Sequence, residues 1–172
     1  LNPKSPAMHL VLARLDAAHG DLDAARGHLE EAIEMKGNYT EAIFALAQLE
    51  AQEGNVQEAI AQTEKVSLIA PNDMGVFFQL GFLRYTARDY VGAARALERT
   101  VFLNPVYANA KYFLGLSYAK LERTDDAIAQ FERIEALNPD NQEVKQILAN
   151  LRASKAALAG IVPPAPPPEN RK

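Results

Sequence analysis

Apolar residues recur at steps of three and four along most of the chain, which is the spacing of an amphipathic helix. The clearest part lies between residues 110 and 137. One run there contains Ala110, Phe113, Leu114, Ser117, Tyr118 and Leu121, and the next contains Ala127, Ile128, Phe131, Ile134 and Leu137. No stretch of more than four residues alternates apolar and polar side chains as a half-buried strand does. The pattern therefore predicts an all-α chain.

Prolines divide this helical pattern at a fixed interval. Pro71, Pro105 and Pro139 are 34 residues apart, and Gly37 and Pro3 continue the interval toward the N-terminus. A repeat of about 20–50 residues is typical of a solenoid. Aligned at this period, the chain divides into four predicted units of two helices each. The units are residues 6–39, 40–73, 74–107 and 108–141.

Small residues repeat with the same period at two places in each unit. The first set is Ala13, Ala47, Gly81 and Gly115, and the second is Ala25, Ala59, Ala93 and Ala127. Two helices approach closely only where the side chains at their contact are small. With Leu114-Gly115, Tyr118, Phe131 and Pro139 in the last unit, residues 6–141 resemble the tetratricopeptide repeat (TPR) family. The resemblance implies a right-handed α-solenoid of antiparallel helix pairs.

One position departs from the family pattern. Where the family usually has tyrosine, the four units have Asp16, Glu50, Arg84 and Tyr118. One explanation is free variation at a position that is expected to be partly exposed. The alternative is an ion pair between Glu50 and Arg84 on neighbouring first helices, which would contribute about 0–1 kcal/mol.

The N-terminal residues continue the repeat. The sequence Leu1-Asn2-Pro3 matches Leu103-Asn104-Pro105 in register. We therefore expect residues 1–5 to be the end of a preceding, truncated repeat.

The C-terminal residues predict a capping helix and a tail. Apolar residues at helical steps extend over residues 142–160, a stretch that Gly160 is expected to stop, and a terminal repeat needs such a helix to cover its apolar side. These residues are Val144, Ile147, Leu148 and Leu151, with Lys145, Gln146, Asn150 and Arg152 expected to face away from them. Residues 161–172 form a Pro-rich tail, a composition that favours extended polyproline II.

Composition excludes several functional classes. Eighteen Lys and Arg residues against 22 Asp and Glu residues give a net charge of -4, which lacks the basic character of a nucleic-acid binder. No apolar run approaches the length of about eighteen residues that a membrane helix requires, so no direct membrane insertion is expected. The absence of cysteine fits both an exported compartment and the cytoplasm, and the cytoplasm is slightly favoured.

The sequence contains little that could support catalysis. Without cysteine there is no thiol nucleophile and no Cys-based zinc site. The three histidines, His9, His19 and His28, have no metal-ligand spacing such as His-x3-His, and no serine lies in a nucleophile elbow. Glycines are isolated rather than gathered in a phosphate-binding loop. We therefore predict no catalytic residues, no metal, no cofactor and no enzyme activity.

The resemblance implies a concave groove lined by the first helix of each unit. The predicted site residues are Phe44, Gln48, Phe78, Gln79, Phe82, Tyr85, Tyr112, Phe113, Leu116 and Lys120. Of the groove positions only Arg14 and Lys120 are basic, so a clamp for a peptide carboxylate is disfavoured. Contiguous exposed apolar patches usually mark binding surfaces. Packing between repeats is the alternative explanation for Phe78 and Phe113.

These observations predict a protein-interaction scaffold that binds an apolar peptide or helix in the concave groove. Its partner would be a protein or peptide with apolar anchors, and the Pro-rich tail could dock in the same groove. Two alternatives stay open. The chain could be a self-associating oligomerisation module. It could also be the accessory arm of a larger bacterial membrane protein, because residues 125–153 resemble the C-terminal repeats of O-antigen ligase-like proteins.

Overall fold

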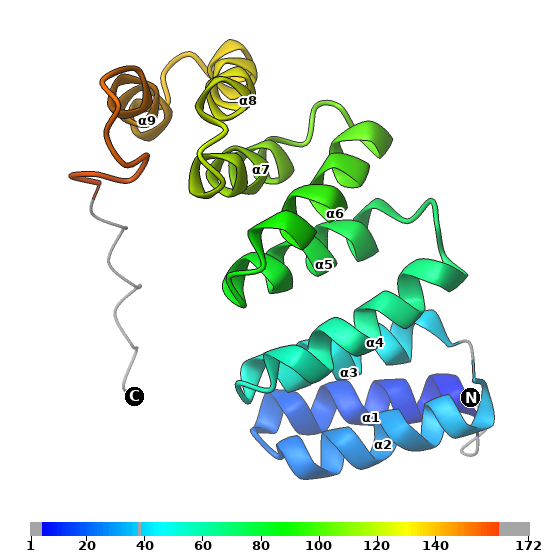
Figure 1. Cartoon of the computed structure of the whole chain (residues 1–172). Helices are drawn as coiled ribbons and strands as arrows, with labels where there is room; N and C mark the ends of the chain where they lie inside the picture. The colour runs from blue at the N-terminus through cyan, green and yellow to red at the C-terminus, as the bar shows by residue number, and fades with distance from the viewer. Residues whose placement is uncertain (1–4, 38, 162–172) are drawn as a thin grey trace.

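The computed structural model describes residues 5–37 and 39–161 of the chain. These residues form nine helices and no strand, which confirms the predicted all-α fold. The helices are α1 (Pro6–His19), α2 (Leu22–Met35), α3 (Thr40–Gln52), α4 (Val56–Ile69), α5 (Met74–Thr86), α6 (Tyr90–Leu103), α7 (Ala108–Lys120), α8 (Thr124–Leu137) and α9 (Gln142–Arg152). Figure 1 shows them following one another along a curved stack, with α1 and α2 at one end and α9 at the other.

Neighbouring helices pack in a regular order. The pairs α1–α2, α3–α4, α5–α6 and α7–α8 are antiparallel, and each lies inside one of the four predicted units. Each first helix also packs on the second helix of the pair before it, and α9 packs on α8. The core is therefore spread along the stack in several clusters of buried residues rather than gathered at one centre.

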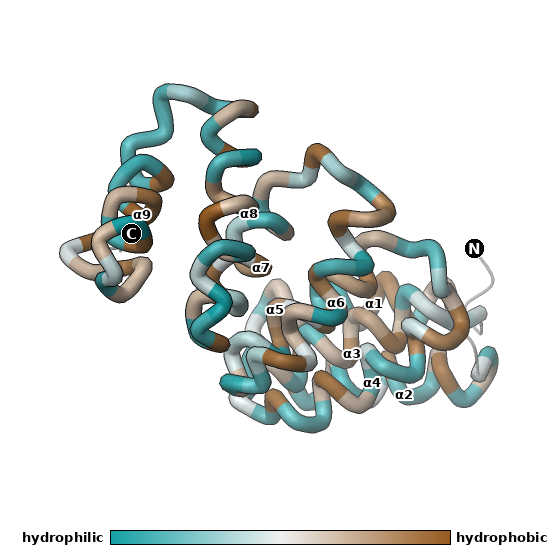
Figure 2. Tube along the Cα trace, turned by 45° about the horizontal axis from the view of Figure 1, so that its top comes forward, coloured by the Kyte–Doolittle hydropathy of each residue, from teal (hydrophilic) through white to brown (hydrophobic). Residues whose placement is uncertain are grey.

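The helices of the described ranges are short, with 11 to 14 residues each. None of them combines the length and the apolar character that crossing a membrane requires. Figure 2 shows apolar and polar residues alternating along the helices instead of forming long apolar segments.

The turn inside each pair uses a left-handed residue at the same place. Gly20 and Gly54 have φ angles of 85° and 87°, and Arg88 and Glu122 have φ angles of 63° and 61°. A residue with this conformation after a helix allows the chain to reverse, and glycine adopts it without steric cost. The last two pairs therefore make the same turn with residues that fit it less well.

The helices of a pair touch at the small residues that the sequence singled out. A Cβ atom built on Gly115 would lie 2.7 Å from Cε2 of Phe131, and one built on Gly81 would lie 2.5 Å from Cγ of Leu97. Phe131 and Leu97 are both completely buried. At these two positions glycine therefore leaves the space that Leu97 and Phe131 occupy.

Side chains at the position where the family usually has tyrosine join α5, α7 and α9 to the helix that precedes each of them. Tyr118 Oη donates to Glu98 Oε1 at 2.7 Å, and Arg152 Nη2 donates to Glu132 Oε1 at 2.8 Å. Arg84 pairs with Glu64 in the same way. In each of these bonds the two partners are 20 residues apart in the sequence, so the same two positions meet in successive repeats.

The ion pair between Glu50 and Arg84 that the sequence offered as an alternative does not form. Glu50 is buried and instead pairs with Arg26 of α2, while Asn55 Nδ2 donates to its other oxygen at 2.9 Å. The residue 20 positions before Glu50 is Glu30, which carries the same charge. Glu50 therefore pairs with a cation that lies one helical turn before Glu30. The hydrogen bond that Arg26 donates to Glu50 is the largest cause of the raised pKa of Arg26.

The capping helix is shorter than predicted. It ends at Arg152 instead of near Gly160, because Ser154 adopts a left-handed φ of 56° and Lys155 N–H donates to Asn150 O at 2.8 Å. Asn150 was expected to face away from the core but is buried. Its Nδ2 donates to the carbonyl oxygens of Ala157 and Ala159 at 3.0 and 2.8 Å. Asn150 thereby holds the segment that follows α9 as a series of turns.

Two terminal predictions fall almost entirely outside the described residues. Of the expected end of a preceding repeat, residues 1–5, only Ser5 is described, and its side chain accepts a bond from Met8 N–H at the start of α1. Of the Pro-rich tail, residues 161–172, only Ile161 is described.

The contact at Gly115 makes a direct test of helix-pair packing. We expect Gly115→Ala to lower the free energy of unfolding by about 1–3 kcal/mol, because the added methyl group would overlap the buried ring of Phe131. Urea unfolding followed by circular dichroism measures the change. The control is Gly27→Ala in the middle of α2, where the new Cβ meets no atom within 4 Å. That substitution should stabilise the chain by about 0.5–1 kcal/mol through helix propensity alone. Equal effects of the two substitutions would contradict the packing argument.

Candidate functional site

All ten predicted site residues lie on three first helices. Phe44 and Gln48 are on α3, residues 78–85 are on α5, and residues 112–120 are on α7. Figure 1 places α5 and α7 on the inner side of the curve, with α6 and α8 outside them. The candidate site is therefore the inner surface of the stack, and its two ends differ in character.

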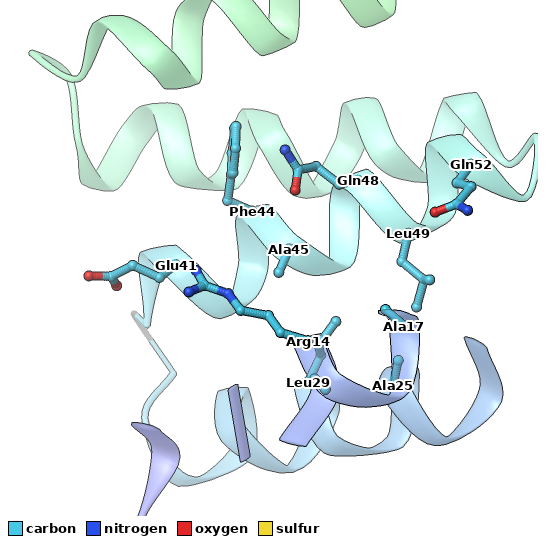
Figure 3. Close-up of a pocket in the computed structure, with 11 residues that line it drawn as sticks. Arg14, Ala17, Ala25, Leu29, Glu41, Phe44, Ala45, Gln48, Leu49 and Gln52 are labelled. Atoms are coloured by element: carbon cyan, nitrogen blue, oxygen red, sulfur yellow. The ribbon is translucent and has the colours of Figure 1, made fainter. Parts of the chain in front are cut away.

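The end formed by α1, α3 and α5 contains two adjoining hollows. One has a volume of about 170 Å³ and lies between α1 and α3, and the other has a volume of about 330 Å³ and lies between the starts of α3 and α5. Glu41 and Phe44 border both hollows. Figure 3 shows Phe44, Gln48 and Gln52 projecting from α3, while Arg14 crosses from α1. This part of the inner surface is open and combines one aromatic ring with polar groups.

The other end is dominated by an aromatic cluster around Phe113. Its ring centroid lies 5.1 Å from that of Phe82, 5.5 Å from those of Tyr85 and Tyr112, and 6.3 Å from that of Phe78. Most of these contacts are edge-to-face, a favourable arrangement for aromatic rings. Phe82 is 38% exposed, whereas Phe78, Tyr85, Tyr112 and Phe113 are half-buried. Most of these rings therefore serve to pack α5 against α7. Phe82 is the ring with the most surface accessible to a ligand.

Tyr112 is turned away from the open part of the groove. Its hydroxyl donates to Glu143 Oε1 of α9 at 2.6 Å, and its ring packs edge-on against Phe131 with centroids 5.8 Å apart. Burial first, and then the bond to Glu143, raise the pKa of Tyr112 above its ordinary value. Tyr112 therefore connects the fourth pair to α9 more than it lines an open surface.

Leu116 does not line an open surface, contrary to the sequence prediction. It is only 4% exposed and borders a small hollow of about 110 Å³, together with Tyr85 and residues 156–158. The turns that follow α9 therefore close over this part of α7. Among the polar predicted residues, Gln48 and Lys120 are exposed and Gln79 is half-buried.

Sequence reasoning missed part of the inner surface and one cluster outside it. Glu41 borders both hollows but was not among the predicted groove residues. Gln52, which follows Phe44 and Gln48 at four-residue steps, is a groove position of the second unit by the same family pattern, and it borders the smaller hollow. His9 and His28 lie close together although their sequence spacing matches no metal motif.

Most of the repeat region matches a known family. Residues 16–77 and 78–142 each match a family profile described as tetratricopeptide repeat. No protein of curated function matches the chain.

Several solved structures share the fold. The MamA fragment from Desulfovibrio magneticus is 23% identical, with a TM-score of 0.80, and the match covers 87% of this chain and 84% of that one. YrrB, described as a TPR protein with an unusual peptide-binding site, is 20% identical with a TM-score of 0.80 over 92% and 84% of the two chains. A thermophilic TPR protein of Thermus thermophilus is 26% identical, with a TM-score of 0.63 over 90% and 85%.

The raised pKa values of Tyr112 and Tyr118 predict how stability changes in alkali. Tyr112 and Tyr118 both titrate above the value of about 10 that tyrosine has in an unfolded chain. Above that pH the unfolded state loses protons that the folded state retains, so the free energy of unfolding should fall as pH rises. Each tyrosine contributes a slope of at most about 1.4 kcal/mol per pH unit.

Tyr112→Phe removes one of these contributions. We expect its stability to fall less steeply above about pH 10 than that of the parent, and Tyr112→Phe with Tyr118→Phe to be flatter still. Urea unfolding at a series of alkaline pH values measures the slopes. If the three proteins show one common slope, the folded-state shifts are absent.

Proposed function

Because the chain belongs to the tetratricopeptide repeat family, we propose that it is a protein-interaction scaffold that binds an apolar peptide or helix along its inner surface. The main observation behind the proposal is the position of Phe44, which borders both open hollows. Phe82, the most exposed ring of the aromatic cluster, provides a second apolar contact on α5. The proposed function is binding and includes no catalytic step.

The volume of the larger hollow supports this proposal. Ligand pockets commonly measure about 300–1,000 Å³, and the hollow between α3 and α5 lies at the lower end of that range. A space of this size suits one large apolar side chain of a partner better than a whole small molecule. The adjoining smaller hollow would take a second side chain of the same peptide.

Polar side chains beside these hollows could form hydrogen bonds with the backbone of a bound peptide. Gln48 and Gln52 project from the same helix as Phe44, and both are exposed. A glutamine amide both donates and accepts hydrogen bonds, as a peptide backbone also does. Arg14 and Glu41, one cation and one anion, border the same hollow. The proposed partner is therefore apolar at its anchors and needs no strong net charge.

The binding free energy sets a minimum for the number of contacts that a partner must make. Covering one large apolar side chain contributes about 1.5–3 kcal/mol, and micromolar binding requires about -8 kcal/mol. Phe44 and Phe82 together therefore fall short, and backbone bonds to the glutamines must add to them. YrrB, which shares the fold and is described as peptide-binding, is consistent with such a surface.

Substitution of the two rings tests the groove. Peptides selected from a random displayed library on the immobilised chain serve as probes, and fluorescence anisotropy measures their affinity. We expect Phe44→Ala with Phe82→Ala to weaken binding at least about 10-fold, because two apolar anchors are lost. The matched control is Phe102→Ala, a ring on α6 that is 74% exposed and belongs to neither hollow. Binding that survives the double substitution, or falls equally in the control, would contradict the proposal.

A further inference from the structure

A cluster of two histidines and a glutamate lies where α1 packs on α2. His9 Nδ1 on α1 is 3.2 Å from His28 Nδ1 and 2.8 Å from Glu31 Oε2, both on α2. His28 Nδ1 is 3.7 Å from the same glutamate oxygen. Three potential metal ligands from two helices therefore converge on one point. This cluster does not involve the hollows of the inner surface.

These separations agree with the geometry of a tetrahedral metal site. Zinc binds histidine nitrogen and carboxylate oxygen at about 2.0–2.2 Å, so two ligand atoms of a tetrahedral site lie about 3.3 Å apart. The three measured separations fall on both sides of that value. Two imidazoles and one carboxylate form a ligand set that divalent zinc and similar transition metals accept.

We propose that His9, His28 and Glu31 bind a divalent transition-metal ion of the zinc class, with water in the fourth position. The metal would connect α1 to α2 and so stabilise the first helix pair. His9 is only 12% exposed, whereas His28 and Glu31 are 31% and 55% exposed. The site is therefore fixed on one side by packing and open to solvent on the other, which allows the ion to enter.

A neighbouring carboxylate supports the choice of ligand atom on His28. Asp16 Oδ2 of α1 lies 3.7 Å from His28 Nε2, on the opposite side of the ring from Nδ1. With Nδ1 bound to the metal, Nε2 carries the ring proton and faces this anion. A carboxylate beside the second nitrogen of a ligating histidine fixes the tautomer and orients the ring.

The helix crossing, rather than the rotamer of one residue, brings these positions together. In the third pair, the equivalent positions place Arg99 over the ring of Phe77 at 5.8 Å. In the fourth pair, Arg133 lies close enough to Lys111 to help lower its pKa, after the larger effect of burial. His9 and Glu31 occupy the same two positions in the first pair, and only there are both residues metal-ligand types.

Direct metal titration of the untagged chain tests the proposal. After removal of metals with a chelator, Zn²⁺ is titrated by isothermal calorimetry, and Co²⁺ by its visible absorption, which reports tetrahedral coordination. We expect one saturable Zn²⁺ site per chain and a higher melting temperature with Zn²⁺ present. The variants His28→Gln and Glu31→Gln should each weaken the affinity at least about 10-fold.

The third histidine provides the matched control. His19 is exposed at the end of α1 and belongs to no part of the cluster, so His19→Gln should retain the affinity of the parent. Circular dichroism verifies that each variant keeps its helical content. We expect it to be kept, because His28 and Glu31 are partly exposed and their substitution leaves the core intact. Absence of saturable Zn²⁺ binding, or an equal loss in the His19 variant, would overturn the proposal. So would retention of the parent affinity in both cluster variants.

Discussion

The third and fourth helix pairs are held together where a glycine of the first helix meets a large residue of the second. At Gly81 and Gly115 the space for a Cβ atom is occupied by Leu97 and Phe131, which are completely buried. This close approach fixes how the two helices of a pair cross. Because the period repeats the same crossing, it also fixes where the next pair begins, and the curvature of the stack follows from it. The inner surface exists because this contact is repeated.

The bonds between neighbouring pairs show how a repeated geometry accommodates different residues. The position of Tyr118 is joined to the preceding second helix by a phenol in one unit and by a guanidinium in others. Glu50 breaks this pattern because Glu30 has the same charge, and it pairs with Arg26 instead. The backbone thus sets which positions meet, and the charges of the residues decide which bond forms there.

The inner surface has an open half and a filled half, and the difference comes from the side chains present in each half. Phe113 gathers the rings of α5 and α7 into one cluster, and the turns held by Asn150 close over Leu116. The first unit has no phenylalanine or tyrosine on α1, and the space beside Phe44 is open. Large side chains on the first helices therefore pack against one another in the filled half and are accessible to a ligand in the open half.

The sequence by itself determined the helices, their period, the small residues at the crossings and the family. These features repeat along the chain, and periodicity records which residues share a face of one helix. Only the tertiary structure decided the end of α9 at Arg152, the burial of Asn150 and Leu116, the partner of Glu50, and the meeting of His9 with His28. Each of these depends on residues of different helices or turns that come together in space. Contacts of that kind follow from helix crossing and side-chain conformation, which leave no periodic signal in a single sequence.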